Sequence, residues 1–270
     1  MTFEPRESGS QQVTRLAKLA SHGPLRVQRP FYPEGSAGSC HVYLLHPPGG
    51  LVSGDALEIE ADVRRGARVL LTTPAAAKVY AADRHGVSSA QRVRLTVQPG
   101  GVLEYLPQQT IVFDGARGRQ VTDLSLASGS VCVGWESMAL GRPASNLPFA
   151  QGLMTQQFRL CVDGRLLWHE RQALDPDRPA FRGLWGLGGC SVQSTLWAVG
   201  LEDPADAVAQ LRATLPLSPR WGVTERAGVM LMRYLGHEAN EAWSLCEQAW
   251  TILRPRLVGT TAVPPRIWRT

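Results

Sequence analysis

One stretch decides the fold class of this chain: Phe158-Arg-Leu-Cys-Val162, then Asp163-Gly164, then Arg165-Leu-Leu-Trp-His-Glu170. Aspartate followed by glycine supplies the positive φ angles of a two-residue type I′ turn. The flanking runs have the length and the alternation of β-strands. The stretch therefore predicts a β-hairpin with strands over 158–162 and 165–170.

The same period of two recurs toward the N-terminus. Apolar side chains at Leu57, Ile59, Ala61 and Val63 alternate with charged ones, which places one face in a core and the other in water. Residues 92–98 alternate likewise, and Pro99-Gly100-Gly101 then leads into 102–106, which predicts a hairpin-like unit. About a dozen such strands favour an antiparallel sandwich, barrel or solenoid over a βαβ fold. No internal repeat is visible, so a regular solenoid does not follow from the residues alone.

Helical patterns occur near the C-terminus. Asp203-Pro204 provides an N-cap followed by proline at the first helical position, and apolar residues then recur at steps of three and four. A second apolar stripe covers about residues 238–254 and is expected to stop before Pro255. Two helices are thus predicted beside a β body.

Composition excludes several classes of protein. The 270 residues are 44% hydrophobic and 19% charged, which is typical of a folded protein. The net charge of +5 comes from arginines scattered singly along the chain, so no nucleic-acid partner is expected. Residues 183–201 lack charge, but their glycines favour two short buried strands over a membrane helix.

The cysteines and the N-terminus indicate a cytoplasmic location. Five cysteines are widely spaced without a Cys-x-x-Cys pair, which favours reduced thiols. The first twenty residues carry early charges and no apolar core segment, so they do not resemble a secretory signal. We expect residues 1–20 to be a flexible N-terminus.

Motifs for catalysis or metal binding are missing. The chain has no nucleophile elbow, phosphate-binding loop, dinucleotide fingerprint or His-Glu-x-x-His helix. No two of the six histidines have a spacing that would bring them to one metal ion, so we name no primary metal ligand. The glycine-rich stretch 46–55, which ends at Asp55, is either a ligand loop or a turn in which Asp55 bonds to nearby backbone amides.

Two glutamates fall on faces that otherwise look buried. Glu170 shares strand parity with Leu166, Trp168 and Leu174, and Glu136 shares it with Cys132 and Met138. A buried carboxylate is costly unless it is paired, hydrogen-bonded, hydrated or bound to a cation. Two readings stay open: pairing with Arg142 or Arg171, or the lining of a wet internal cavity that passes hard or borderline cations.

Six phrases, in order from residue 23 to the C-terminal end, carry a family resemblance: Gly23-Pro-Leu-Arg-Val-Gln-Arg-Pro-Phe-Tyr-Pro33, Cys40-His-Val-Tyr-Leu-Leu-His-Pro-Pro-Gly-Gly-Leu-Val-Ser-Gly-Asp55, Thr72-Thr-Pro-Ala-Ala-Ala-Lys-Val-Tyr80, Leu103-Glu-Tyr-Leu-Pro-Gln-Gln-Thr-Ile-Val-Phe-Asp-Gly-Ala116, Gly141-Arg-Pro-Ala144 and Pro264-Pro-Arg-Ile-Trp268. Together they resemble the UreD family of urease accessory proteins, called UreH in some bacteria. Asn146-Leu147 stands where the family frequently has Gly-Glu.

The resemblance implies a fold and a role. Combined with the strand pattern, it leads us to expect a mainly β protein of many short antiparallel strands in stacked, solenoid-like sheets with two C-terminal helices, residues 21–270 forming one domain. It implies a non-catalytic accessory protein that helps load nickel into apo-urease. The implied partners are apo-urease, UreF, and the GTPase UreG through UreF, in a dimeric complex. No tightly bound cofactor is expected, nickel being in transit through an internal water-filled passage.

Residue by residue, the resemblance points to three acids. Asp55 matches the acid of the family's Gly-Gly-x-x-x-Gly-Asp phrase, Glu136 an acid after a tryptophan, and Glu170 an acid before an arginine. These three are the candidate nickel-passage residues. Two alternatives stay open: a β-rich hydrolase that uses Asp55 and a buried glutamate, and a clamp on urease without metal passage.

Overall fold

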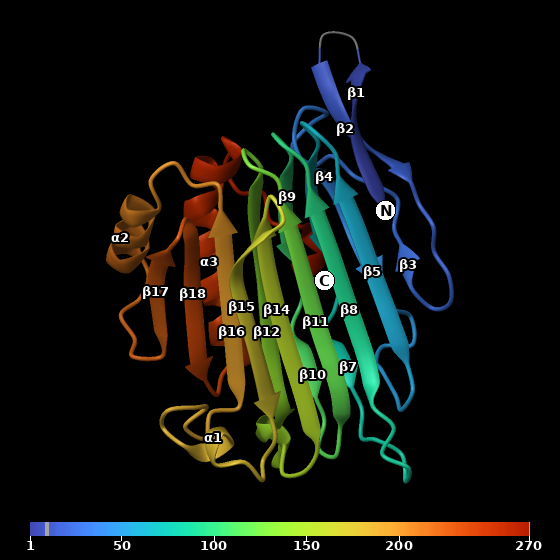
Figure 1. Cartoon of the computed structure of the whole chain (residues 1–270), viewed down its shortest axis with the longest axis vertical. Coiled ribbons are helices and arrows are strands. Elements are labelled where there is room, and N and C mark those ends of the chain that lie inside the picture. The colour runs from blue at the N-terminus through green and yellow to red at the C-terminus, as the bar shows by residue number, and fades with distance from the viewer. Residues whose placement is uncertain (9–10, 270) are drawn as a thin grey trace.

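Two packed β-sheets and a layer of helices make up the protein, seen in a computed structural model that describes residues 1–8 and 11–269 (Figure 1). The first sheet has seven strands, in the order β15 (Arg165–Leu174), β14 (Leu153–Val162), β11 (Arg117–Leu126), β8 (Ser89–Val97), β5 (Ala56–Val63), β1 (Thr2–Ser8) and β2 (Gln11–Lys18). The main path of the second sheet is β17 (Trp221–Arg226), β18 (Val229–Gly236), β16 (Val192–Val199), β12 (Val131–Arg142), β9 (Val102–Leu106), β6 (Arg68–Thr72), β4 (Cys40–Leu45) and β3 (Arg26–Val27). Three short strands complete it: β7 (Ala77–Val79), β10 (Thr110–Val112) and β13 (Leu147–Pro148).

The hairpin predicted over 158–162 and 165–170 is confirmed, and its strands are longer, at 153–162 and 165–174. β14 and β15 pair antiparallel, and Val162 stands opposite Arg165 across the two-residue turn. Asp163 and Gly164 both have positive φ angles, 48° and 76°, as a type I′ turn requires. The mainly β class with stacked sheets is likewise confirmed.

Pairing in the middle of both sheets differs from the prediction. β5, β8, β11 and β14 run parallel to one another, as do β4, β6, β9 and β12. The expectation of antiparallel strands is therefore wrong for these strands. The solenoid-like description is not confirmed, since the sheets differ in strand number and antiparallel pairs form at both ends. Alternation shows which side chains are buried, but not which strand lies alongside.

The turn at 99–101 shows why the prediction failed. It joins β8 of the first sheet to β9 of the second, so 92–106 is a crossing between sheets and not a hairpin. Gly101 sits where a Cβ would lie 2.9 Å from the Gln98 carbonyl oxygen, which makes this corner too tight for other residues. Repeated crossings of this kind make consecutive central strands alternate between the sheets.

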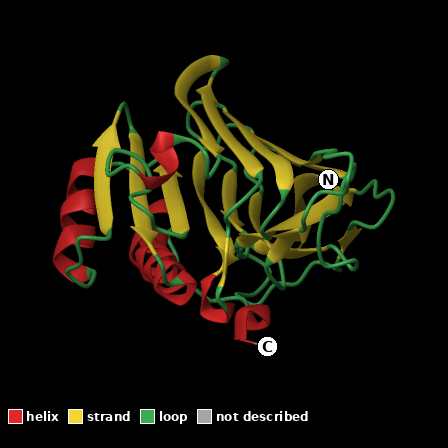
Figure 2. Cartoon of the chain, turned by 90° about the horizontal axis from the view of Figure 1, so that it is seen from below, coloured by secondary structure: helices red, strands yellow, loops and turns green. Residues whose placement is uncertain are grey.

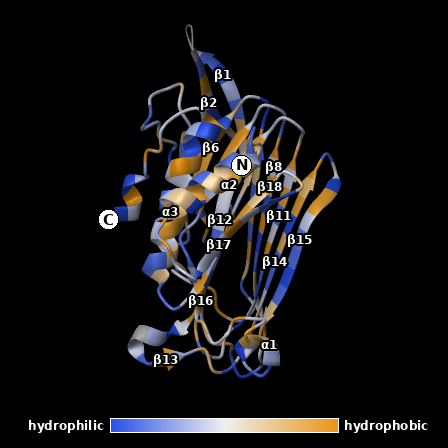
Figure 3. Ribbon diagram, turned by 90° about the vertical axis from the view of Figure 1, so that its left-hand side faces the viewer, coloured by the Kyte–Doolittle hydropathy of each residue, from blue (hydrophilic) through white to orange (hydrophobic). Residues whose placement is uncertain are grey.

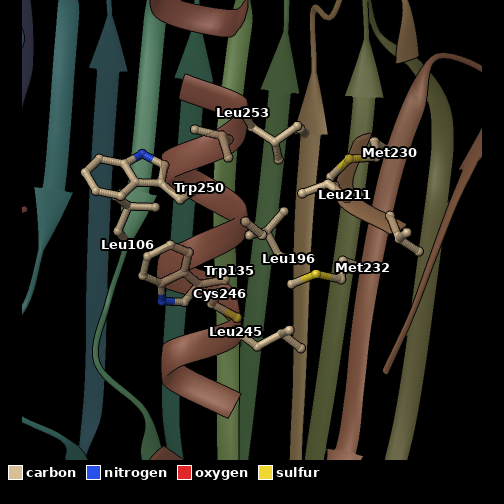
Figure 4. Close-up of a cluster of buried hydrophobic side chains, with 14 of the residues drawn as sticks. Leu106, Trp135, Leu196, Leu211, Met230, Met232, Leu245, Cys246, Trp250 and Leu253 are labelled. Atoms are coloured by element: carbon tan, nitrogen blue, oxygen red, sulfur yellow. The ribbon is translucent and has the colours of Figure 1, made fainter. Parts of the chain in front are cut away.

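Apolar side chains fill two layers. Between the sheets, a core includes Phe3, Leu95, Leu103 and Phe158, and hydrophobic and hydrophilic residues alternate along the strands that bound it (Figure 3). The second layer lies between the outer face of the second sheet and the helices α2 (Pro204–Thr214) and α3 (Ala239–Val258) (Figure 2). Figure 4 shows side chains of this layer. Leu211 comes from α2, and Leu245, Cys246, Trp250 and Leu253 come from α3. The strands contribute Leu106, Trp135, Leu196, Met230 and Met232.

The two predicted helices exist, with one boundary corrected. The side chain of Asp203 accepts a hydrogen bond from the Asp206 amide (2.9 Å) and so caps α2. Pro255 does not end α3, which continues to Val258 and is closed by Gly259 at a φ of 79°. Proline removes one hydrogen bond with the preceding turn, and packing of Leu257 and Val258 maintains the last turn. Three short helices were not predicted: α1 (Pro179–Arg182), η1 (Pro143–Ser145) and η2 (Arg266–Arg269).

The segments 1–20 and 183–201 also differ from expectation. Where we expected a flexible N-terminus, β1 and β2 form a hairpin and the side chain of Phe3 is fully buried; residues 9 and 10 lie outside the described residues. Segment 183–201 contains one strand, β16, and not two, because its first half is a glycine-rich loop. No helix in the described residues has the length and apolar character needed to span a membrane.

Candidate functional site

Glu136 points into the space between the two sheets. It lies on β12 in the second sheet, yet its carboxylate accepts hydrogen bonds from Thr122 on β11 and from Gln156 Nε2 on β14 (2.9 Å), both in the first sheet. Glu136 as a whole residue is 6% exposed. No ion pair in the described part of the chain involves its carboxylate. Burial raises the pKa of the carboxyl, and the hydrogen bonds only partly offset that effect.

Side-chain amides surround Glu136. The Gln156 Oε1 accepts a hydrogen bond from Gln193 Nε2 (3.0 Å), and Gln120 adds a further hydrogen bond that lowers the pKa of Glu136. Amides can reverse their donor and acceptor ends. The carboxylate is therefore held by neutral groups that can accommodate either of its protonation states.

Glu136 lines two cavities. The larger, about 120 Å³, lies between the sheets and includes His46, Gly50 and Lys78 in its lining, together with Glu136. The smaller, about 50 Å³, is lined by Glu136, Gln156, Glu170, Gln172 and Gln193, and by Phe158, Thr195 and Trp197. Each has room for several waters, since one water needs roughly 10–15 Å³ of such space. The polar lining supplies hydrogen-bond partners for them.

Glu170 stands at the solvent side of the smaller cavity. Its side chain is 34% exposed and forms an ion pair with Arg233 of β18, while Trp168 Nε1 donates to its Oε1 (2.5 Å). Glu170 therefore does pair with an arginine, as one of the two hypotheses held, but the arginine is Arg233 and neither Arg142 nor Arg171. The structure brings Glu136 and Glu170 to one cavity, as the parity argument led us to expect.

Parity fails for Leu166 on the same strand. Leu166 is 51% exposed although it shares parity with Trp168 and Glu170. The pairing of β14 with β15 shifts register between Leu160 and Cys161, and a bulge reverses the face that later residues present. The buried face therefore begins only at Trp168.

Asp55 occupies a turn. Its Oδ2 accepts a hydrogen bond from the Val52 amide (2.9 Å) and its own amide donates to the Val52 carbonyl (3.1 Å). Gly54 has a φ of 81°, so this turn needs glycine. Asp55 lines neither of the two cavities at Glu136. Of the two readings of the stretch 46–55, the turn describes Asp55, whereas His46, Gly49 and Gly50 do line the larger cavity.

A second buried carboxylate escaped the sequence analysis. Glu104, on β9, is fully buried and receives hydrogen bonds from Arg254 Nε (2.9 Å), Trp250 Nε1 (2.8 Å) and Ser39 Oγ (3.0 Å). Arg254, also fully buried, donates to Glu34 Oε1 (2.7 Å) as well. These contacts link Arg254 of α3 to Glu104 of β9 and so hold the helix against the second sheet. The signal of this cluster in the sequence was Glu104 within a strand of otherwise apolar residues.

Glu34 completes this cluster. Its Oε1 also lies 3.0 Å from His41 Nε2. Burial would raise the pKa of the Glu34 carboxyl, but hydrogen bonds and charge from His41 and Arg254 outweigh it and hold the pKa below its usual value. Within the described ranges, no group of three or more His, Cys, Asp and Glu residues has the arrangement of a metal site.

Comparison with known proteins identifies the family. The model of the UreD urease accessory protein family matches residues 2–269. This chain belongs to the UreD family. It is 62% identical over 269 residues to "Urease accessory protein UreD" of Marinobacter nauticus, covering 99% of this chain and 90% of that protein. It is 58% identical over 264 residues to that of Chromohalobacter salexigens (95% and 84% covered), and 55% identical over 268 residues to that of Pseudoalteromonas translucida (99% and 89%).

Membership of the UreD family bears on the competing functions. These relatives are named as accessory proteins of an enzyme, and not as enzymes themselves. The hydrolase hypothesis requires Asp55 and a buried glutamate to act together. Asp55 is held in a turn and lines neither of the cavities that Glu136 lines. The chain is therefore a urease accessory protein of the UreD type.

Proposed function

We propose that this UreD protein is a non-catalytic scaffold that binds apo-urease together with UreF, and UreG through UreF, and that nickel reaches urease by way of its internal cavities. The observation that carries the proposal is that Glu136 lines two cavities, each with room for several waters, with Glu170 at the outer side of the smaller one. The family resemblance supplies the partners and the cargo.

The chemistry of the cavities suits a divalent cation in transit. Carboxylate, carbonyl and water oxygens are ligands of divalent cations, and they suit a borderline ion such as Ni²⁺ less well than imidazole does, so they would hold it weakly. Glu136 and Glu170 lie on different strands, and each would offer an ion a single carboxylate. Passage requires binding strong enough for entry and weak enough for exit, which single carboxylates in a hydrated cavity provide.

Burial couples Glu136 to a passing cation. Desolvation raises the pKa of its carboxyl, so a nearby cation would stabilise the carboxylate form more than it would an exposed one. Metal ligands bind in the deprotonated form, so binding of a cation here would depend on pH. The amides around Glu136 can then turn their oxygens toward the ion.

The test is urease activation in cells that co-express the urease subunits and the other accessory proteins. We expect Glu136→Gln and Glu170→Gln to remain folded and to copurify with the partners, while urease nickel content and activity fall at least about tenfold. Asp55→Asn is the matched control, because it removes a carboxylate outside the two cavities. Wild-type nickel content with both glutamine variants would favour a clamp without metal passage.

A separate arm tests the scaffold itself. Deleting this protein should leave urease expressed but poor in nickel. Full nickel occupancy without it would contradict the accessory role. Hydrolysis of a substrate by the purified protein alone would support the hydrolase hypothesis instead.

A further inference from the structure

Strand β15 forms one edge of the first sheet. It pairs with β14 along one side, from Arg165 to Leu174, and no strand of the described residues pairs with its other side. The first and the last described residues lie elsewhere. β1 pairs with β5 toward the opposite edge of this sheet, and Trp268 donates a hydrogen bond to Thr72 of β6 in the second sheet (2.8 Å).

The free backbone groups of β15 follow from the bonds of its neighbour. The amides of Leu153 and Asp163, at the two ends of β14, donate to carbonyls on the side of β11 (both 2.9 Å), so the even-numbered residues of β14 face β15. These even-numbered residues stand opposite the even-numbered residues of β15 from 168 to 174, for example Glu170. Directly opposed residues alternate between pairs that exchange hydrogen bonds and pairs that do not. The N–H and C=O groups of His169 and Arg171 therefore point away from β14, and the described residues provide no main-chain partner for them.

The second sheet extends beyond this edge. β18 and β17 continue it past β15 (Figure 1). On β18, Leu231 faces the first sheet, whereas Met232 packs toward the helices. The part of the inner face that β15 does not cover forms the floor of a groove.

This groove has a volume of about 350 Å³ and an open, partly apolar lining: Trp168 of β15, Gly222, Val223 and Thr224 of β17, and Leu231 and Arg233 of β18. A Cβ placed on Gly222 would meet no atom within 4 Å, so the floor has free space above it. Free backbone groups beside such a groove are the elements by which proteins add an extended peptide to a sheet. A peptide paired with β15 would place alternate side chains in the groove.

The outer face of β15 specifies the other side chains of that peptide. His169 stands opposite Arg159, and Arg171 stands opposite Gln157. His169 and Arg171 are exposed, and neither takes part in an ion pair within the described ranges. The outer side of this edge thus presents basic side chains.

The acidic side chains within and directly after β15 are already engaged. Glu170 pairs with Arg233, and Asp175 pairs with Arg178 (3.2 Å). Opposite charges on neighbouring strands attract, and like charges directly opposite each other are destabilising. An added strand with acidic residues beside Arg171 is therefore favoured. A second copy of β15 is disfavoured, because it would set basic residues against basic residues.

We propose that the β15 edge is a docking site for an extended segment of a partner protein in which acidic and apolar residues alternate. The segment adds a strand beside residues 168–173, with apolar side chains in the groove and acidic side chains beside His169 and Arg171. The site differs from the nickel passage proposed above, because it uses free backbone groups and surface basic residues. Its test measures binding in the absence of urease.

The probe is a fluorescein-labelled, C-terminally amidated hexapeptide of alternating valine and glutamate, titrated with the full-length protein by fluorescence anisotropy. We expect saturable binding, and weaker binding of a valine–arginine peptide. Two N-methylated forms, one methylated at the valine amides and one at the glutamate amides, serve as controls. Only one set of amides faces β15 in a bound strand, so one form should bind at least about tenfold more weakly than the other. Which form weakens reports the strand direction.

Protein variants locate the site. Arg171→Pro removes an edge-directed N–H and leaves the bonds to β14 intact, so binding should fall at least about tenfold. Arg171→Gln is the matched control, because it also lacks the charge but keeps the N–H, and it should reduce binding less. Arg171→Glu should shift preference toward the valine–arginine peptide. Urea unfolding midpoints close to wild type show that the variants are folded.

Several outcomes overturn the proposal. Equal binding of both N-methylated forms, or equal weakening by Arg171→Pro and Arg171→Gln, means attraction between charges without strand addition. Absence of binding means that the basic residues only protect the edge from pairing. Concentration-dependent dimers in sedimentation that Arg171→Pro abolishes mean that a second copy of the chain, and not a partner segment, covers the edge.

Discussion

Two buried glutamates of this UreD protein, Glu104 and Glu136, occupy contrasting surroundings. Glu104 is fully buried against the guanidinium of Arg254. Glu136 is 6% exposed, receives hydrogen bonds only from neutral side chains among the recorded contacts, and borders two cavities. One carboxylate is neutralised by a fixed cation of the protein. The other has no such cation and retains access to water-sized space.

The difference separates a buried carboxylate that has a fixed cation beside it from one that has only neutral partners. A buried acid with a fixed guanidinium stabilises the packing of the elements that carry the two groups, provided that both remain. A buried acid among amides pays the cost of desolvation in the absence of a cation. Glu136 therefore has a free-energy cost that a visiting cation would reduce, whereas Glu104 does not. The predictions below test this contrast, from the largest effect to the smallest.

Removal of Arg254 should cost the most stability. Arg254→Met leaves Glu34 and Glu104 without their cation and also removes the contact with Trp250. Breaking a buried pair on one side costs about 3–5 kcal/mol, which we expect in urea unfolding at pH 7. Arg256→Met is the control on the same helix, because its pair with Asp206 is at the surface and is worth less than about 1 kcal/mol. Equal losses for both variants would contradict the assigned role of the cluster.

Neutralising Glu34 should cost less, and the cost should depend on pH. Glu34→Gln weakens charge-assisted bonds to Arg254 and His41, for an expected loss of about 1.5–3 kcal/mol at pH 7. Because the folded-state pKa of Glu34 is lowered, its contribution is fully present above the ordinary value of 4.5 and is lost as pH falls through the folded-state pKa.

The measurement for Glu34 is a series of urea unfolding curves from pH 7 to pH 3 on the wild type and the variant. The difference in unfolding free energy between them should shrink as the pH falls below 4.5. A difference that is constant over this range would mean that the charge of Glu34 contributes nothing.

Glu136→Gln should have the opposite sign. Glutamine needs no desolvation of a charge, so we expect the variant to be more stable than the wild type by about 1 kcal/mol at pH 7. Because burial raises the folded-state pKa of Glu136, the unfolded chain ionises first, and wild-type stability falls as pH rises above 4.5 toward the folded-state pKa. The difference from glutamine should therefore vanish below pH 4.5 and grow above it.

The same unfolding series checks Glu136, with Glu34→Gln as the matched comparison of opposite pH dependence. A loss of several kcal/mol for Glu136→Gln at pH 7 would show that its carboxylate is structural. Loss of urease activation by a variant that is more stable than wild type would separate a role in nickel transfer from a role in folding.

The sequence predicts the kind of structure better than the arrangement of its parts. The turn at Asp163-Gly164 and the cap at Asp203 are set by residues close in the chain, and both are confirmed. Parallel pairing of β8 with β5 and β11 depends on where the chain crosses between the sheets. The alternation of apolar and polar residues does not show where these crossings occur. Pro255 within α3 shows that tertiary packing can override a local signal.

In the candidate site, too, the sequence predicted which side chains point inward but not their partners. Parity identified Glu136 and Glu170 as inward-facing, and the structure places both at one cavity. Neither Gln156 nor Arg233 could be assigned as a partner, because each contact joins the two sheets and the sequence did not predict which strands face each other. Glu104 was missed because its cation lies 150 residues away in the chain.

The smallest stability effect is expected at Glu170. Its pair with Arg233 joins side chains that are 34% and 53% exposed, and pairs of this kind contribute less than about 1 kcal/mol. Trp168 Nε1 keeps an acceptor if Glu170→Gln presents its amide oxygen in the same place. Urea unfolding of Glu170→Gln, Arg233→Gln and the double variant gives the coupling free energy between the two side chains. A coupling above about 3 kcal/mol would place Glu170 with Glu104 as a structural carboxylate, whereas a small coupling with impaired urease activation places it with Glu136.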